Sequence, residues 1–222
     1  MIIDQIEKSE NVKKAIKEAK SIYQLNEDWD KEMTTFDSCF NLGDFVISDY
    51  HNNPEAKISP DSTTYKVLKK CYSLWINYTA KSKKVTKMGS SYPVESILSW
   101  MNSKAESIRN PGEDEFFLKY ALISGHDITI SPILLSLGLL DTDCLLNDLM
   151  TGKDTMGCNH SPPLASNILF ELVQLKAEFY VRSMYNGAPL DICELNTTNN
   201  GHLCPLEEFT KIAKEKFVLD NY

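Results

Sequence analysis

Apolar residues recur at helical spacing over three stretches of the first half of the chain. In residues 4–25, 62–78 and 92–107 they fall three or four positions apart, with lysine, glutamate and other polar residues between them. That spacing places the apolar side chains on one face of a helix, so the pattern predicts three amphipathic helices. The basic stretch 81–87 is interpreted as a surface connection where the helical part of the chain ends.

The pattern changes at residues 116–123, where the chain is almost continuously apolar and rich in β-forming side chains. Such a run is typical of a strand buried on both faces. Pro132 at a first helical position and Gly138 at the far end predict a short helix after it. Open α/β sheets bind ligands at the carboxyl ends of their strands, so the turn between this strand and helix is a candidate site. Its sequence is Ser124-Gly125-His126-Asp127.

The last third of the chain combines strand and helix signals. Alternating apolar and polar positions predict antiparallel strands over residues 165–172 and 178–185, after a polar, turn-rich loop over residues 141–163. A turn signal then leads into a third strand over residues 188–195. A final amphipathic helix begins at Pro205. Strands that follow and precede helices in this order indicate an α/β fold.

Composition excludes several classes of partner. The net charge is -8 and the sequence pI is about 5.1, which argues against binding to nucleic acid or an anionic membrane, because phosphate groups are bound by clustered basic residues. Only Arg109 and Arg182 are arginines, the usual bidentate ligands of phosphate. The sequence has no apolar window long enough for a transmembrane helix, and its first residues lack the regions of a signal peptide.

Cysteines and acceptor-type triplets point to an oxidising compartment. The chain has six cysteines, an even number, and three triplets of the glycosylation type that begin at Asn77, Asn159 and Asn196. Together they favour a lumenal or extracellular location. The absence of a signal peptide is therefore interpreted as truncation.

Few other residues suggest chemistry. The four histidines, His51, His126, His160 and His202, are too far apart for zinc-ligand spacing, and no Cys-x-x-Cys pair occurs, so we expect no metal site. No Walker loop, Gly-x-Gly-x-x-Gly turn or Gly-x-Ser-x-Gly motif is present. What remains is His126-Asp127. On sequence physics alone, a capping aspartate beside a packed histidine and a catalytic pair are equally good interpretations.

Several ordered motifs of the second half together resemble a known family. Besides the His-Asp turn they include Leu134-Leu135, Leu137-Gly138-Leu139, residues 165–172, residues 180–187 and Cys204-Pro205-Leu206-Glu207-Glu208-Phe209. In this order they are similar to the C-terminal half of the histidine acid phosphatases, branch 2 of the histidine phosphatase superfamily. The resemblance implies an α/β fold, with part of a mixed-sheet, phosphoglycerate-mutase-like core over residues 86–222 and an α-helical cap over residues 1–85.

The resemblance also implies roles for two residues. In this family the residue that matches His126 contacts the phosphoryl oxygens, and the residue that matches Asp127 is the proton donor to the leaving group. Both roles suit the chemistry, since an imidazolium stabilises oxyanions and a carboxylic acid supplies a proton. The implied partner is a phosphomonoester substrate, hydrolysed at acid pH through a phosphohistidine without a cofactor. The resemblance is compatible with a homodimer.

For the cysteines, the resemblance implies a disulfide between Cys193 and Cys204. The pairing of Cys39, Cys71, Cys144 and Cys158 stays open, because six cysteines allow 15 pairings. Cys144 with Cys158 and Cys39 with Cys71 are local alternatives, and each cysteine could also be a buried free thiol.

The sequence departs from the family in its nucleophile. These phosphatases attack with the histidine of an Arg-His-Gly-x-Arg motif near their N-terminus, whereas this chain has no Arg-His-Gly, and neither Arg109 nor Arg182 matches the arginines that hold the phosphate. We therefore expect a truncated part of a secreted or lysosomal (vacuolar) acid phosphatase, inactive alone, with an exposed sheet edge and apolar surface. The alternative is a catalytically dead protein that binds a phosphate ligand or a partner.

Overall fold

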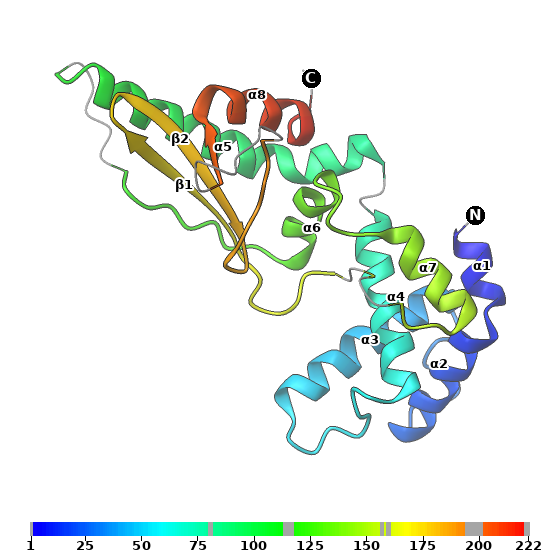
Figure 1. Cartoon of the computed structure of the whole chain (residues 1–222). Coiled ribbons are helices and arrows are strands. Elements are labelled where there is room, and N and C mark those ends of the chain that lie inside the picture. Colours follow the sequence, from blue (N-terminus) through cyan, green and yellow to red (C-terminus); the bar gives the residue numbers. More distant parts are fainter. Residues whose placement is uncertain are drawn as a thin grey trace. The chain divides into compact units, whose positions relative to one another are not determined.

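The chain folds into two compact units, and each unit consists of two separate segments of the sequence. The computed structural model describes residues 2–79, 82–112, 118–155, 158, 161–193 and 202–219. The first unit, which we call the helical unit, consists of Met1–Thr79 and Leu139–Ser161. The second, the sheet unit, consists of Ala80–Gly138 and Pro162–Tyr222 (Figure 1). Helices and a small sheet together make an α/β protein, as predicted.

The helical unit buries the apolar faces of its helices against one another. The helices described in it are α1 (Ile2–Lys8), α2 (Glu10–Ile22), α3 (Thr35–Asn52), α4 (Thr63–Thr79) and α7 (Thr142–Thr151). Leu42, Leu68 and Leu145 are among the core side chains that are fully buried. Two disulfides belong to this unit, Cys39–Cys71 between α3 and α4 and Cys144–Cys158 between α7 and the segment that follows it.

Two predicted elements of the helical unit differ from the structure. The helix predicted over residues 4–25 is divided at Ser9, which has extended backbone angles (φ -75°, ψ 114°) and is the N-cap of α2, although its side chain makes no capping hydrogen bond. Helix α7 lies within the predicted polar loop. Its local signals are clear in retrospect, because Asp141 accepts a hydrogen bond from the N–H of Cys144 at 2.9 Å, and Gly152 ends the helix with a φ of 71°.

Gly43 allows a close approach of α3 and α4. A Cβ atom at this position would collide with the carbonyl oxygen of Leu68 and lie 3.0 Å from the Cβ of Tyr72. We expect Gly43→Ala to lower the free energy of unfolding by about 1–3 kcal/mol through this overpacking. Urea unfolding followed by circular dichroism tests it, with Ser48→Ala at an exposed position of α3 as the control. Alanine is the better helix former, so a stabilised Gly43→Ala variant would contradict the close approach.

A buried ion cluster joins α4 to α7 and to the chain that follows α7. The Nζ of Lys70 lies 3.2 Å from Oδ2 of Asp148, 2.9 Å from Oδ1 of Asp154 and 2.7 Å from the carbonyl oxygen of Lys153. The Lys70 and Asp148 side chains are 5% and 0% exposed. Burial alone would raise the pKa of Asp148, but hydrogen bonds from the hydroxyl and N–H of Thr155, together with Lys70, lower it.

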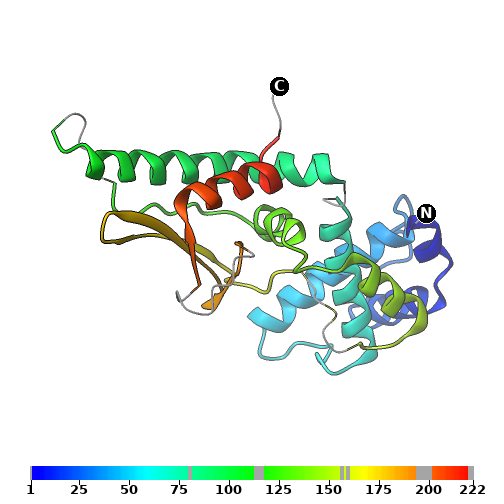
Figure 2. The same cartoon turned by 45° about the horizontal axis from the view of Figure 1, so that its top comes forward.

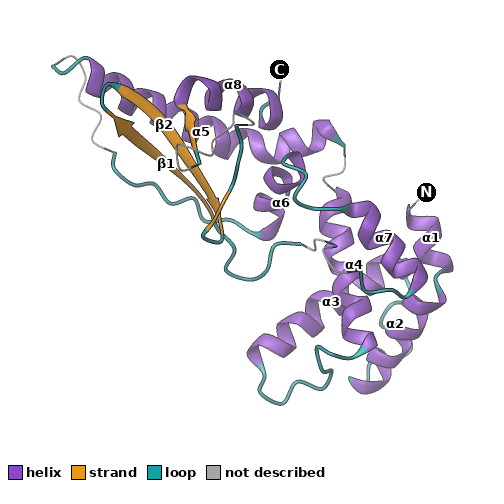
Figure 3. Cartoon of the chain, viewed as in Figure 1, coloured by secondary structure: helices purple, strands orange, loops and turns teal. Residues whose placement is uncertain are grey.

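The sheet unit packs helices beside a small antiparallel sheet (Figure 3). Its strands are β1 (Ile168–Leu175), β2 (Glu178–Tyr185), β3 (Ala188–Pro189) and β4 (Leu203–Pro205), and its helices are α5 (Lys83–Arg109), α6 (Asp127–Ser136) and α8 (Leu206–Phe217). β1 and β2 form a hairpin with Leu172 opposite Val181, and β2 also pairs with β3 and β4. Every pairing among the described strands is antiparallel.

Helix α8 and a disulfide secure this sheet. Figure 2 shows α8 lying along α5, while the ring of Phe209 on α8 packs 5.6 Å from that of Phe170 on β1. The disulfide Cys193–Cys204, which the resemblance implied, ties β4 to the chain after β3. The third strand, predicted over residues 188–195, is reduced to the two residues of β3, and residues 194 and 195 lie outside the described part.

The strand predicted over residues 116–123 is the largest difference from the structure. Residues 118–126 form no strand, and residues 116 and 117 lie outside the described part. Tyr120 and Leu122 are 72% and 77% exposed, although the prediction placed this segment in the interior. A strand requires a neighbouring strand for its backbone hydrogen bonds, and local sequence cannot supply one. The prediction of a buried strand is therefore wrong for the described residues.

Both helices around this segment also begin earlier than predicted. Helix α5 begins at Lys83 within the predicted surface connection, because Ser82 caps it by accepting a hydrogen bond from the N–H of Val85 at 3.2 Å. Helix α6 begins at Asp127, so Pro132 lies inside it rather than at its first position. Gly89 of α5 faces Pro132, whose Cγ would lie 2.8 Å from a Cβ at Gly89, and glycine thus lets α5 and α6 pack closely.

Candidate active site

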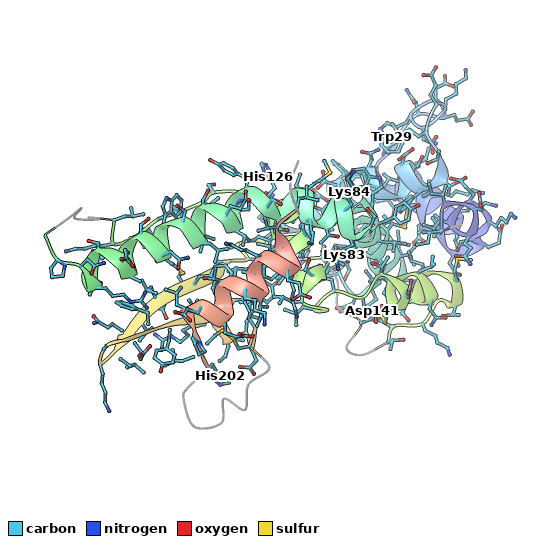
Figure 4. All side chains as sticks on the ribbon, turned by 90° about the horizontal axis from the view of Figure 1, so that it is seen from above. Trp29, Lys83, Lys84, His126, Asp141 and His202 are labelled. Atoms are coloured by element: carbon cyan, nitrogen blue, oxygen red, sulfur yellow. A yellow bond between two sulfur atoms is a disulfide. The ribbon has the colours of Figure 1, made fainter. Side chains whose placement is uncertain are left out.

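His126 and Asp127 lie at the N-terminal end of α6, directly after the extended segment (Figure 4 labels His126). His126 is the N-cap, with extended backbone angles φ -108° and ψ 176°. Its carbonyl oxygen accepts the N–H of Thr129 at 2.9 Å, and its side chain is exposed. Asp127 is the first helical residue and is partly buried. The two side chains therefore come from the turn at which the sequence placed the candidate site.

Thr129 fixes the backbone of this turn. The N–H of His126 donates a hydrogen bond to Oγ1 of Thr129 at 3.2 Å, which closes the first turn of α6. Gly125 makes room for this contact, since a Cβ there would lie 2.8 Å from the same hydroxyl oxygen. Sequence reasoning missed Thr129. The available signal was a hydrogen-bonding side chain three positions after the N-cap residue.

The turn combines groups that suit an anionic ligand. Oδ1 of Asp127 accepts the N–H of Ile128 at 2.8 Å, which orients the carboxyl group at the start of the helix. The N-terminal end of a helix carries partial positive charge and favours anions. An exposed imidazole can add a hydrogen bond or a positive charge, and a carboxyl group can exchange a proton. The arrangement is thus chemically capable of binding an anion and protonating a group on it.

A groove of about 1080 Å³ opens in the sheet unit next to this turn. Its walls come from α5, from residues 118–125, from the first turns of α6 and from residues 166–172, and we call it the α5–β1 groove. Ser124, Gly125 and Thr129 line it, whereas His126 and Asp127 do not. The groove therefore reaches the candidate site but does not contain its two titratable groups.

Both arginines have other contacts. The guanidinium of Arg109 lies 5.2 Å from the centre of the Phe179 ring, an attractive cation–π geometry. Nε of Arg182 lies 2.5 Å from Oε2 of Glu171 across the β1–β2 ladder. These contacts give each arginine a structural role, in line with the mismatch between their positions and the family's phosphate clamp.

The remaining histidines do not gather with His126. Nδ1 of His202 lies 2.6 Å from Oδ1 of Asp191, and Figure 4 shows His202 well apart from His126. His51 packs edge-on against Tyr50 in the helical unit, and His160 lies outside the described residues. Within the described part of the chain, no three histidine, cysteine or acidic side chains gather as metal ligands would.

Of the three glycosylation candidates, only Asn77 lies in the described part of the chain. The side chain of Asn77 is fully buried in the helical unit, where neither amide atom has a hydrogen-bond partner. Glycosylation at Asn77 stays a prediction. Asn159 and Asn196 lie outside the described residues. No helix of the described part combines the length and the apolar composition that crossing a bilayer requires.

Comparison with known proteins identifies a protein family whose model matches this chain. The model of the histidine phosphatase superfamily (branch 2) matches residues 5–186. 2-Phosphoxylose phosphatase 1 of Mus musculus is 29% identical over 126 residues, which are 53% of this chain and 22% of that protein. The Rattus norvegicus protein of the same name is 32% identical over 109 residues, 46% of this chain and 18% of that protein. The match thus spans about a fifth of each relative's length.

Proposed function

This chain belongs to the histidine phosphatase superfamily (branch 2), and from that premise we propose that it carries the phosphate-contact and proton-donor part of a phosphomonoesterase site. The observation that carries the proposal is the turn at the start of α6, where an exposed imidazole and an oriented carboxyl group meet the positive end of a helix. His126 is assigned to the phosphoryl oxygens and Asp127 to the leaving-group oxygen.

In the proposed chemistry, His126 and Asp127 have different roles. An imidazolium at position 126 stabilises negative charge on the phosphoryl oxygens, and the carboxyl group of Asp127 protonates the departing alkoxide. Thr129 positions both by holding the backbone of the turn. The reaction assigned to the complete site is hydrolysis of a phosphomonoester. The curated relatives are named for a phosphorylated pentose, so sugar phosphates are the substrate class to test first.

The nucleophile of the proposed site lies outside this chain. No Arg-His-Gly motif occurs in it, and the relatives it matches are about five times as long as the matched part. We propose that the chain is one part of a larger phosphatase and is inactive alone. Its three disulfides support a secreted or lysosomal-type compartment, because disulfides persist where thiols are not kept reduced.

Binding of inorganic phosphate tests the proposed site in the chain as it stands. Titration at about pH 5, followed by NMR of the histidine rings, is expected to shift the His126 resonances with a dissociation constant in the millimolar range, about -4 kcal/mol. His126→Ala should weaken binding about tenfold or more, as expected for loss of a charged hydrogen bond.

His202→Ala serves as the matched control for this titration, because His202 is also exposed but pairs with Asp191 away from the proposed site. It should leave phosphate binding unchanged. Resonances of His202 that shift with those of His126 unchanged would reject the assignment of His126 as the phosphate contact.

A further inference from the structure

The disulfide Cys144–Cys158 differs from the other two disulfides in its exposure. Cys144 is only partly buried at the edge of the helical core, whereas each of the other five cysteines is 6% exposed or less. Thiol–disulfide exchange begins when a thiolate attacks one of the two sulfur atoms, so its rate depends on access to that sulfur. Of the three disulfides, Cys144–Cys158 is therefore the one that a reductant reaches most readily in the folded chain.

This disulfide also closes a short ring of chain that contains most of the ion cluster. Cys144 and Cys158 are 14 positions apart in the sequence. The three oxygen atoms that Lys70 contacts belong to residues of this ring: Asp148, Lys153 and Asp154. Thr155, also in the ring, donates its N–H to Oδ2 of Asp148 at 2.8 Å and its hydroxyl to Oδ1 at 2.7 Å. The ring is thus held both by a covalent bond and by the cluster.

The disulfide and the cluster should stabilise each other. With the disulfide formed, the ring residues are already close to one another, so the cluster forms with little loss of chain freedom. In the reduced chain, the cluster has to order the same residues by itself. Linkage between two such effects is reciprocal, so contacts that hold the ring closed also oppose reduction of the disulfide.

The ring lies where the chain returns from the helical unit to the sheet unit. The helical unit ends at Ser161, and β1 begins at Ile168. With the disulfide formed, the chain is tied to α7 as far as Cys158. Once the disulfide and the cluster open, the last ordered residue before β1 is Thr151, the end of α7. Reduction would therefore lengthen the connection between the helical unit and β1.

We propose that Cys144–Cys158 is a redox switch that sets the length of this connection and that the ion cluster keeps closed. A dithiol reductant opens it in two steps. One thiolate of the reductant attacks Sγ of Cys144, and Cys158 leaves as a thiolate that takes up a proton. The second thiolate attacks the mixed disulfide, Cys144 leaves and is protonated, and the reductant, having given up two electrons, closes its own disulfide. The proposal does not depend on the proposed function.

Partial reduction of the full chain tests the order of the three disulfides. The chain is equilibrated with mixtures of reduced and oxidised dithiothreitol at about pH 8, where thiolates form, and free thiols are trapped with iodoacetamide and mapped by mass spectrometry. Cys144–Cys158 should be half reduced at a ratio of reduced to oxidised reagent about tenfold or more below that of the other two. Amide exchange should then become fast at Lys153 and Thr155, while α3 and α4 stay protected.

Two results of this experiment would overturn the proposal. One is reduction of either of the other disulfides before Cys144–Cys158 or together with it. The other is loss of amide protection throughout α3 and α4 on reduction of Cys144–Cys158, because the helical unit would then unfold as a whole rather than release the ring.

Thr155→Val tests the role of the cluster with little change in side-chain shape. It removes the hydroxyl that donates to the Asp148 carboxylate, and it should lower the half-reduction ratio of this disulfide about tenfold. Thr151→Val is the matched control, since the Thr151 hydroxyl donates to the carbonyl oxygen of Asn147 within α7. It should leave the ratio unchanged, and circular dichroism checks that both variants fold. An unchanged ratio in Thr155→Val, or an equal change in both variants, would show that the cluster does not keep the switch closed and would overturn the proposal.

Discussion

The chain alone is expected to release no phosphate from p-nitrophenyl phosphate above the buffer rate at about pH 5. It offers the proposed proton donor and the proposed phosphate contact but no histidine in an Arg-His-Gly setting, and its arginines contact Phe179 and Glu171. Covalent catalysis cannot begin without the nucleophile, whose removal costs on the order of a million-fold in a comparable mechanism. Steady-state release of p-nitrophenol from the purified chain measures this.

The same assay distinguishes the proposed part of a phosphatase from a complete enzyme. Turnover that disappears in Asp127→Asn would mean that the site is complete in this chain, and the assignment of an outside nucleophile would be wrong. In a longer chain that supplies the Arg-His-Gly-x-Arg segment, Asp127→Asn should slow turnover about 100- to 10,000-fold through loss of general acid catalysis. His202→Ala should leave that turnover unchanged.

Elements with strong local signals could be predicted nearly to the residue. The hairpin strand expected over residues 178–185 is β2 (Glu178–Tyr185), and the helix expected over residues 62–78 is α4 (Thr63–Thr79). In both, side-chain periodicity is set by neighbouring elements that are present in the chain. The position of the turn that carries His126 and Asp127 was also predictable, because Gly125 and the His-Asp pair mark the place where an extended segment ends and a helix begins.

Elements that depend on distant partners could not be predicted in this way. Residues 116–123 have the composition of a central strand, but pairing requires another strand, and composition does not say whether that strand is in the chain. The role of Thr129 depends on a backbone contact with His126 that periodicity does not encode. Helix α7 was not predicted, because its polar residues suggested a loop. In the structure these residues cap the helix and take part in the ion cluster.

The ion cluster of the helical unit gives the largest expected effect on stability. Lys70→Met is expected to lower the free energy of unfolding by about 3–5 kcal/mol, because it leaves the buried carboxylate of Asp148 without its cation. Lys66→Met is the matched control. Lys66 lies 3.3 Å from Asp154 but both side chains are about half exposed, so its loss should cost only about 0–1 kcal/mol. Urea unfolding, with amide exchange in α4 and α7 as the local probe, measures both.

The stability of the wild-type chain and that of Lys70→Met should depend differently on pH. Asp148 and Asp154 have lowered pKa values in the folded chain, Asp154 chiefly through its hydrogen bond from Lys70. Their stabilisation is present above the unfolded aspartate pKa of about 3.9 and is lost as pH falls through the lower folded values. Without Lys70, the pKa of Asp148 should rise above its value in the wild-type chain, because only the hydrogen bonds from Thr155 then oppose the effect of burial. Acid therefore protonates the unpaired carboxylate more readily in the variant and removes part of its cost. The stability difference is thus expected to shrink from pH 7 to pH 4, and a constant difference would place its origin in packing rather than charge.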